Sequence, residues 1–379
     1  MKRVVLLGST GSIGQSTLKV VHDLPDRLKL VGLAAGGGNI EEFARQINEY
    51  HPPLACLYDA KKLPELKSKL TAKTKVVTGE EGLIELAKMK EADVVLIAIV
   101  GTAGLRPALA AIECGKDIAV ASKEILVMAG EAVTTAAKRK KVKILPVDSE
   151  HNAIWQCIDG KPGHEVRNLW LTASGGPFRK TPKADFATIT LDQALKHPTW
   201  NMGGKITIDS ATMMNKGLEM IEARWLFDIE MKRVQVVIHP QSIIHSMVEF
   251  VDGSLLAQLC EPNMRLPIQY ALTYPERLPN TLPHANFEKM STMQFEMPDI
   301  ERFPALRLAR ESGERGGTAP AVFNAANEVA VARFVNGKIN FPAIWGTVER
   351  VLSAHKVTEH APLETIIDAD TWAREEAAR

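Results

Sequence analysis

The chain begins with the stretch VVLLGSTGSIGQSTLKVVH at residues 4–22, in which an apolar run, a glycine-rich turn and a helix-like segment follow one another. This order predicts a strand, a tight turn and a helix N-terminus. Glycines at such a turn let the backbone approach a pyrophosphate, whose charge is met by free N–H groups and the positive end of the helix dipole. The GxxGxxG spacing departs from the usual GxGxxG, so a turn without a ligand is the alternative. Its place at the start of a βαβ pattern favours a dinucleotide.

The end of the next predicted strand, residues 28–34, indicates which dinucleotide. NAD-binding folds usually place an Asp or Glu there to hold the ribose 2′-hydroxyl. Here the chain continues with Ala35-Gly36-Gly37-Gly38-Asn39, which contains no acid. Because a carboxylate would repel a 2′-phosphate, its absence favours NADP over NAD. A glycine loop that contacts no ligand is the alternative.

Length, charge and cysteine content bound the remaining possibilities. The 379 residues suffice for two or three domains. A formal net charge of +1 argues against a nucleic-acid partner and favours small molecules. The four cysteines lie far apart without a CxxC pair, which is typical of a reducing compartment. The most apolar run, residues 94–100, is too short to span a membrane. We therefore expect a cytoplasmic protein with no membrane or nucleic-acid partner.

The first 150 residues alternate strand-like and helix-like segments, which predicts a doubly wound parallel sheet of the Rossmann-like α/β class. The predicted strands are residues 4–7, 28–34, 75–78, 93–100, 117–121 and 142–147. Ligands of such sheets gather at the carboxyl ends of the strands. Three polar clusters fall at such ends: Gly8–Gly14, Ser122–Glu124 and Asp148–Glu150. We assign residues 1–150 to a dinucleotide-binding domain.

The remaining sequence predicts two further domains. Residues 151–274 are typical of a central α+β catalytic domain, with strands at 167–172, 243–250 and 254–259 and a helix at 216–227. The last two strands are expected to form a hairpin. Proline-rich residues 275–304 predict a linker. Residues 305–379 predict a C-terminal helical domain, with helices at 305–312, 319–335, 341–355 and 363–378.

Three carboxylates are candidate metal ligands. Asp148 and Glu150 lie two residues apart at a strand end, so their side chains point to one face and repel each other unless a cation joins them. Oxygen ligands suit Mg²⁺ or Mn²⁺. The alternative is that Asp148 or Ser149 caps the following helix. Glu219 lies in a helix that is apolar on most faces, and either a metal or an ion pair with a basic residue such as Arg224 would satisfy it.

Hydroxyl, amide and ammonium groups of the central domain indicate a phosphate site. Ser174 lies beside two glycines after a strand, and Ser210, Asn215 and Lys216 precede or begin the helix that carries Glu219. Ordinary loops of this composition are the alternative. Residues 197–205, HPTWNMGGK, combine Trp200 with a Gly-Gly pair, which predicts a mobile lid over a substrate. Trp200 could instead simply anchor the loop.

Taken together, these segments resemble the 1-deoxy-D-xylulose 5-phosphate reductoisomerase family. The runs that carry the resemblance are residues 8–14, 121–124, 145–154, 171–178, 209–227 and 238–250. They span almost the whole chain. The runs at 148–152 and 209–227 are the most specific.

The resemblance implies roles for individual residues. The metal-ligand positions, for Mg²⁺ or Mn²⁺, are those of Asp148, Glu150 and Glu219. The NADPH positions are Thr10, Gly11, Ser12, Ile13, Gly36, Gly37, Gly38, Asn39, Ser122, Glu124 and Gly203. The substrate positions are Lys123, Ser149, Glu150, Ser174, His197, Ser210, Asn215, Lys216 and Glu219, of which Lys123, Glu150, His197 and Glu219 are expected to be catalytic. Met264 falls in a stretch that faces the site, and the family implies a homodimer.

The implied activity is the rearrangement of 1-deoxy-D-xylulose 5-phosphate and its reduction by NADPH to 2-C-methyl-D-erythritol 4-phosphate, in non-mevalonate isoprenoid biosynthesis. One departure concerns Gly36–Gly38, where family members usually carry a basic or other side chain that reaches the 2′-phosphate. A simpler NADP-dependent dehydrogenase and a non-catalytic NADP-sensing protein are the rival hypotheses, and neither needs three carboxylates and a lid.

Overall fold

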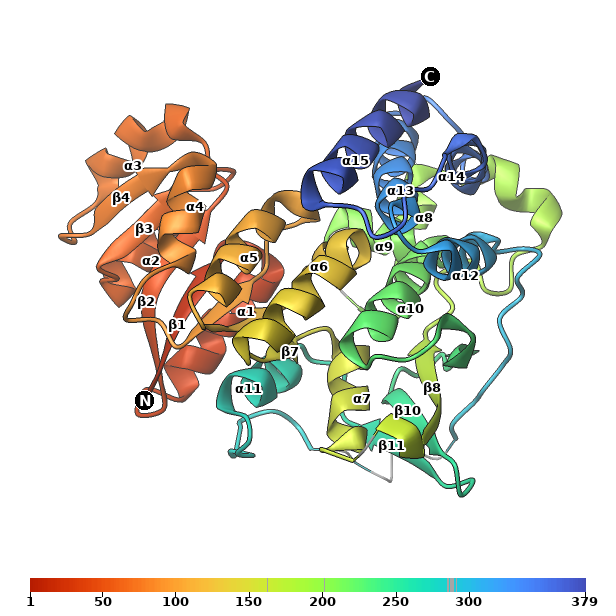
Figure 1. Cartoon of the computed structure of the whole chain (residues 1–379), viewed down its shortest axis with the longest axis horizontal. Coiled ribbons are helices and arrows are strands. Elements are labelled where there is room, and N and C mark those ends of the chain that lie inside the picture. The colour runs from red at the N-terminus through yellow and green to blue at the C-terminus, as the bar shows by residue number, and fades with distance from the viewer. Residues whose placement is uncertain (162, 201, 285, 287–289, 291) are drawn as a thin grey trace. The chain divides into compact units, whose positions relative to one another are not determined.

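The computed structural model describes residues 1–379 except 162, 201, 285, 287–289 and 291 (Figure 1). Its contacts divide the chain into two compact units. Unit 1 comprises Met1–Ile125, Val133–Asn152 and Asn263–Leu282, and unit 2 comprises Leu126–Ala132, Ala153–Pro262 and Pro283–Arg379. Each unit is described by itself. The three domains and the linker expected from the sequence remain a prediction.

Unit 1 is built on a seven-stranded parallel sheet in the order β4-β3-β2-β1-β5-β6-β7. Its strands are β1 (Lys2–Leu7), β2 (Leu28–Ala35), β3 (Leu54–Leu57), β4 (Lys75–Thr78), β5 (Val94–Ile97), β6 (Asp117–Val120) and β7 (Ile144–Pro146). Strand order reverses between β1 and β5, and the crevice at such a switch point is where doubly wound folds bind ligands. The predicted Rossmann-like sheet is confirmed. Strand β3 comes in addition to the predicted strands.

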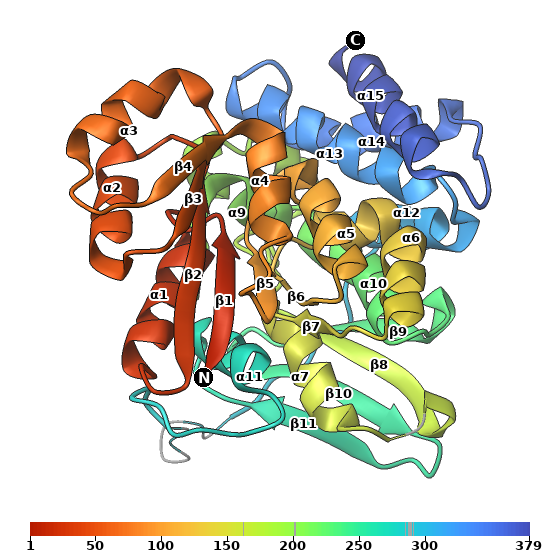
Figure 2. The ribbon, with the colours of Figure 1, turned by 60° about the vertical axis from the view of Figure 1, so that its left-hand side comes forward.

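Helices cover both faces of this sheet, because right-handed crossovers, the rule in parallel sheets, lie on opposite faces when the strand order reverses. They are α1 (Ser12–Asp23), α2 (Ile40–Tyr50), η1 (Ala60–Lys62), α3 (Leu63–Lys69), α4 (Gly79–Ala87), η2 (Gly101–Gly104) and α5 (Leu105–Glu113). Figure 2 shows α1 to α3 on one side and α4 and α5 on the other. Helix α11 (Arg265–Thr273) returns to this unit and packs on α1. Helices α6 (Glu124–Lys140) and α7 (Ser149–Ile158) contribute residues to both units.

Unit 2 contains a mixed sheet in the order β11-β10-β8-β9. Its strands are β8 (Val166–Ala173), β9 (Val234–Ile238), β10 (Ile244–Phe250) and β11 (Leu255–Leu259). The antiparallel pair β10–β11 confirms the predicted hairpin. Strand β9, which pairs in parallel with β8, comes in addition to the predicted strands. Glu296, within the stretch predicted as a linker, forms a bridge with Ile238 of β9.

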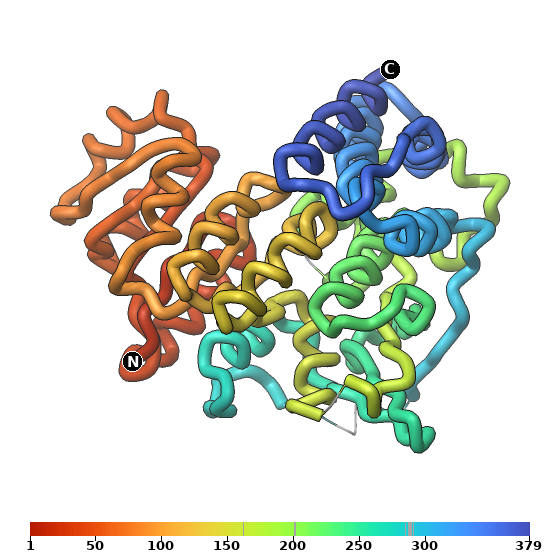
Figure 3. The backbone as a smooth tube through the Cα atoms, in the orientation of Figure 1, coloured from red at the N-terminus to blue at the C-terminus, as the bar shows by residue number. Residues whose placement is uncertain are grey.

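Most helices of unit 2 contribute apolar side chains to a common core. They are η3 (Gly163–Glu165), η4 (Lys183–Thr188), α8 (Leu191–Ala194), α9 (Gly204–Ala211), α10 (Met214–Leu226), η5 (Met231–Arg233), α12 (Ala305–Arg315), α13 (Ala319–Val335), α14 (Ala343–Ala354) and α15 (Leu363–Ala378). Helix α10 packs on α12, and α13 packs on α14 and α15. An extended segment leads to α12 (Figure 3). Among the described residues, no helix combines the length and apolar character needed to cross a membrane.

Candidate active site

The glycine turn after β1 is fixed by steric necessity. Gly8 has a φ of +97°, and a Cβ atom there would lie 2.4 Å from the Ala98 carbonyl oxygen. A Cβ atom on Gly14 would lie 2.3 Å from the Gly8 carbonyl oxygen. Gly11 caps α1 without a side-chain hydrogen bond, which leaves the first N–H groups of the helix to meet an anion. The structure therefore places Thr10, Gly11, Ser12 and Ile13 around a helix N-terminus at the switch point of the sheet.

The loop after β2 has open space around two of its glycines, whereas the turn after β1 is crowded. A Cβ atom on Gly36 or Gly38 would have no atom within 4 Å, whereas Gly37 has a φ of +108° that L side chains rarely adopt. Asn39 caps α2, because its Oδ1 accepts from the Glu42 backbone N–H at 3.0 Å. Residues 36–39 thus present backbone groups and open space at the carboxyl edge of the sheet.

The ends of β6 and β7 bring Lys123 and Asp148 together. The Lys123 ammonium lies 2.5 Å from the Asp148 carboxylate, and both side chains are largely buried. Burial opposes ionisation of Asp148, but the charges of Lys123 and His151 and hydrogen bonding with Glu150 and Lys123 hold its pKa below the usual range. Asp148 is therefore an anion with a lysine partner within unit 1.

Further residues predicted for the site lie at or near the starts of α6 and α7, the helices that follow β6 and β7. The Ser149 hydroxyl donates to the Glu150 carboxylate at the start of α7. The Ser122 hydroxyl donates to the Ile99 carbonyl, and Glu124 begins α6 and is buried. Met264 is the N-cap residue of α11 in the same unit.

In unit 2, three predicted substrate residues meet at one imidazole. The His197 Nε2 atom lies 3.0 Å from the Ser174 Oγ and 3.1 Å from the Ser210 Oγ. The Gly175-Gly176 turn makes this possible, since a Cβ atom on Gly176 would lie 2.7 Å from the Ser210 carbonyl oxygen. We call Ser174, His197 and Ser210 the phosphate cluster.

The surroundings of His197 fix its tautomer. Its Nδ1 atom accepts backbone N–H groups of Trp200 at 2.9 Å and Thr199 at 3.2 Å, so Nδ1 carries no proton. Burial lowers the pKa of His197 to about 4, and the ring is neutral near pH 7. The single proton therefore resides on Nε2, where the ring can donate to a serine hydroxyl or to a phosphate oxygen.

Helix α10 holds the remaining predicted residues of unit 2. Glu219 is 1 % exposed and accepts from the Asn215 amide and the Lys216 ammonium, which lie four and three residues earlier respectively on the same face of the helix. The alternative of an ion pair within the helix is thus realised, with Lys216 as partner. Arg224 donates to the Gly313 carbonyl at 2.9 Å.

The predicted lid, residues 197–205, begins at His197 of the phosphate cluster and ends in the first turn of α9. The edge of the Trp200 ring packs on buried His245, with ring centroids 6.1 Å apart. Gly203 is the N-cap residue of α9. Asn201, also within the predicted lid, lies outside the described residues.

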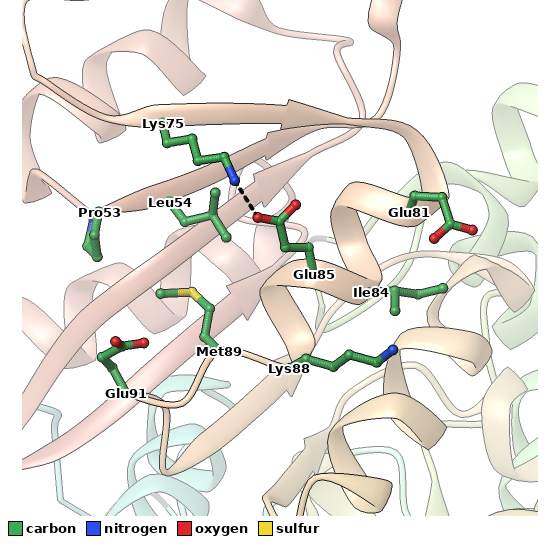
Figure 4. Close-up of a pocket in the computed structure, with 9 residues that line it drawn as sticks. All are labelled: Pro53, Leu54, Lys75, Glu81, Ile84, Glu85, Lys88, Met89 and Glu91. Atoms are coloured by element: carbon green, nitrogen blue, oxygen red, sulfur yellow. Dashed lines mark hydrogen bonds and ion pairs between the residues drawn. The ribbon is translucent and has the colours of Figure 1, made fainter.

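A hollow of about 600 Å³ lies away from these groups, in unit 1 (Figure 4). It is lined by Pro53, Leu54, Lys75, Glu81, Ile84, Glu85, Lys88, Met89 and Glu91, and Lys75 pairs with Glu85 at 2.6 Å. No residue predicted for the active site lines this hollow. We therefore assign no function to it.

Comparison with known proteins decides the family. Models of the 1-deoxy-D-xylulose 5-phosphate reductoisomerase, its C-terminal domain and the DXP reductoisomerase C-terminal domain match residues 4–130, 144–227 and 259–376 respectively. The 1-deoxy-D-xylulose 5-phosphate reductoisomerase of Pelotomaculum thermopropionicum is 52% identical, covering 99% of this chain and 97% of the relative. The chain belongs to the 1-deoxy-D-xylulose 5-phosphate reductoisomerase family.

Other members of the family are similar to this chain over its full length. The reductoisomerase of Chlorobaculum tepidum is 52% identical over 100% of this chain and 99% of its own. The Zymomonas mobilis enzyme, solved in complex with NADPH, has 45% identity and a TM-score of 0.93, covering 100% of this chain and 98% of its own. A DOX-P reductoisomerase solved with NADPH, fosmidomycin and magnesium has 40% identity and a TM-score of 0.92, covering 100% and 97%.

One buried contact in this family member was not predicted from the sequence. Asp209 in α9 is 1 % exposed, lies 2.8 Å from the Lys205 ammonium and accepts from the Asn327 amide of α13 at 2.8 Å. It precedes Ser210 and so ties the helix of the phosphate cluster to the C-terminal helices. The available signal was an acid that follows Ile206 and Ile208 in a short helix, because such an acid needs a partner once it is buried.

Proposed function

We propose that this chain rearranges 1-deoxy-D-xylulose 5-phosphate and reduces the product with NADPH to 2-C-methyl-D-erythritol 4-phosphate, in non-mevalonate isoprenoid biosynthesis. The full-length relationship to reductoisomerases, at up to 52% identity among the relatives described, carries this proposal. We assign cofactor binding to residues 1–150, catalysis and dimerisation to 151–274, a linker to 275–304 and a helical domain to 305–379.

The residues of unit 1 suit NADPH. The crowded turn at Gly8 and Gly14 leaves no room for side chains and brings main-chain N–H groups to the place where a pyrophosphate would lie. We infer that Thr10, Gly11, Ser12 and Ile13 hold the pyrophosphate and that Gly36, Gly37, Gly38 and Asn39 lie along the adenosine ribose. Ser122, Glu124 and Gly203 are proposed as further contacts.

We infer that Asp148, Glu150 and Glu219 bind a divalent cation, Mg²⁺ or Mn²⁺. Carboxylate oxygens are the ligands these ions prefer, and each unit places a buried acid beside a lysine: Asp148 beside Lys123 and Glu219 beside Lys216. Bound there, the cation would supply positive charge against the negative charge that develops on the substrate oxygens during rearrangement. Lys123 would add a second positive charge to those oxygens.

The phosphate cluster is proposed to hold the substrate phosphate. The Nε2–H group of neutral His197 and the hydroxyls of Ser174 and Ser210 are donors that converge on one place. Asn215 and Lys216 at the first turn of α10 would complete it, with the helix N-terminus favouring an anion.

Firm binding at the phosphate matters because the substrate skeleton breaks between C3 and C4 and then re-forms. Held by its phosphate, one fragment stays in the orientation needed for the new carbon–carbon bond. Ser149 and Glu150 are proposed to orient the other end of the substrate. The aldehyde that results accepts hydride from NADPH.

We propose that residues 197–205 close over the bound substrate. Trp200 would exclude water from the fragments. Because His197 Nδ1 accepts the Trp200 backbone N–H, a phosphate ligand of His197 and the lid are linked through one ring. The four free cysteines accord with a reducing, cytoplasmic location.

We also infer a homodimer. The edge strand β11 exposes Leu255 and Leu256, 50% and 42% respectively, beside Val251 at 62%. Exposed apolar side chains on a sheet edge favour association with a second chain. Light scattering after gel filtration should give twice the mass of 41.5 kDa.

The deciding experiment is NADPH oxidation with 1-deoxy-D-xylulose 5-phosphate, with and without Mg²⁺. Oxidation that requires both substrate and cation, with 2-C-methyl-D-erythritol 4-phosphate as product, is expected. Oxidation without a divalent cation would favour a simpler dehydrogenase. NADPH binding without turnover would favour an NADP-sensing protein.

A further inference from the structure

The loop that would meet the 2′-phosphate of NADPH has no ionisable side chain of its own. Residues 36–39 are three glycines and an asparagine, and the Asn39 oxygen is used as a helix cap. The acids that follow are engaged by cations of their own: Glu41 by Lys69 at 2.5 Å and Glu42 by Arg45 at 2.7 Å. A dianionic 2′-phosphate in this loop therefore needs a cation from another element.

The loop after β3 lies directly against this loop. Strands β2 and β3 run in register, with Ala35 opposite Leu57. Beyond the strands, the Tyr58 N–H donates to the Ala35 carbonyl at 2.9 Å and the Asp59 N–H donates to the Gly36 carbonyl at 3.2 Å. The short helix η1 that follows is thereby held beside Gly36–Gly38.

Lys62, the last residue of η1, reaches into the glycine loop. Its ammonium donates to the Gly37 carbonyl at 2.8 Å, and its Cδ atom would lie 3.6 Å from a Cβ atom on Gly37. In the described part of the chain, no carboxylate oxygen lies within 4.0 Å of this ammonium. Asp59, the acid of the same turn, accepts the Lys61 N–H at 3.1 Å. Lys62 is thus a half-buried cation whose contact is a carbonyl of the candidate cofactor loop.

We propose that Lys62 binds the 2′-phosphate of NADPH and sets the preference for NADPH over NADH. An ammonium has three N–H donors, so the bond to Gly37 holds it in place while two donors remain for phosphate oxygens. The glycines leave the space that the phosphate needs, since Gly36 and Gly38 have no atom within 4 Å of a Cβ position. Lys62 so replaces the basic side chain that relatives usually carry in the loop itself. The inference rests on the proposed function, because it takes NADPH as the cofactor.

The test measures dissociation constants of the full-length protein for NADPH, NADH and 2′,5′-ADP by fluorescence and calorimetric titration, without substrate. Lys62→Met should weaken NADPH and 2′,5′-ADP by about tenfold or more, since a charge-assisted hydrogen bond is lost. NADH should change less than twofold, and Lys62→Arg should recover most of the NADPH affinity. Lys61→Met, on the exposed neighbour in η1, is the matched control and should change nothing.

Two results would overturn the proposal, and they can be told apart. If Lys62→Met, shown to be folded by circular dichroism, weakens NADPH and NADH equally or not at all, Lys62 does not bind the 2′-phosphate and the proposed function is untouched. If the unaltered protein binds neither NADPH nor NADH, the proposed function fails as well.

Discussion

The candidate cofactor loops of unit 1 and the phosphate cluster of unit 2, both proposed to bind a phosphate group, are built by different means. The turn after β1 uses backbone shape: its glycines are required because any Cβ atom at Gly8 or Gly14 would collide with main-chain atoms. The phosphate cluster uses side chains that already bond to one another through His197. The first region should therefore be sensitive to added volume, and the second to altered charge.

The largest effect is expected where volume is added to the crowded turn. A Cβ atom on Gly14 would lie 2.3 Å from the Gly8 oxygen and 2.5 Å from two Ser9 backbone atoms. Gly14→Ala should lower the free energy of unfolding by about 1–3 kcal/mol, since the backbone must shift, and should abolish tight NADPH binding. Chemical denaturation measures the free energy of unfolding, and titration with NADPH measures the dissociation constant. Gly36→Ala, where nothing lies within 4 Å, is the matched control and should stay within about 0.5 kcal/mol. Equal losses of stability in Gly14→Ala and Gly36→Ala would contradict the difference between the crowded turn and the open loop.

A substitution that changes the charge of Glu219 but not its shape tests whether this residue of α10 binds the metal. Glu219→Gln should reduce turnover about a hundredfold, equivalent to roughly 3 kcal/mol, and weaken Mn²⁺ binding, because one anionic ligand is lost. It should also lower the Tm, since buried Lys216 loses its carboxylate contact. Glu230→Gln makes the same change on an exposed glutamate of this unit and should leave turnover, Mn²⁺ binding and the Tm unchanged. Unchanged turnover at limiting Mn²⁺ would remove Glu219 from the metal site.

Placing a charge in the open loop after β2 should make the cofactor region depend on charge as well. Gly38 lacks a positive φ and has open space around it, so Gly38→Arg fits, whereas Gly37→Arg would be strained at a φ of +108°. Gly38→Arg should raise the NADPH-to-NADH ratio of kcat/KM by about tenfold, through a charge-assisted bond to the 2′-phosphate. Gly38→Met adds similar length without charge and should leave the ratio unchanged. A wild-type preference for NADH would overturn the NADP assignment.

The smallest effect concerns the protonation of His197. Burial lowers its pKa to about 4, against about 6.5 in the unfolded chain. The unfolded state therefore binds more protons between these values, and the contribution of His197 to stability is lost as the pH falls from about 6.5 towards 4. The Cε1 proton resonance of His197, identified with His197→Gln, should stay constant from pH 8 to about 5.5. In urea the same resonance should titrate near pH 6.5. A midpoint near 6.5 in the folded protein would contradict the neutral Nε2–H donor.

The sequence by itself determined the class of the fold and the positions of the candidate residues. Apolar runs that end at polar or glycine clusters mark strands of the parallel sheet, and this local pattern is sufficient for β1, β2 and β4 to β7. The hairpin at Val251–Gly253 and the buried helix α10 also carry strong local signals. Strand β3 has only four residues and little β-branched character, so its hydrogen-bonding neighbours decide it. Strand β9 is rich in valine and isoleucine, and its signal was present in the sequence.

Only the tertiary structure decided the partners of the polar side chains. The attachment of Asp209 to Asn327, the contact of Lys62 with Gly37 and the contact of His197 with Ser174 join residues that are distant in sequence. The sequence indicates that a buried acid or a phosphate-binding glycine loop needs a polar partner, but the chain contains many lysines and serines that could be that partner. Which one does so depends on how β-strand register and helix packing bring backbone segments together, because a hydrogen bond requires its two atoms within about 3 Å.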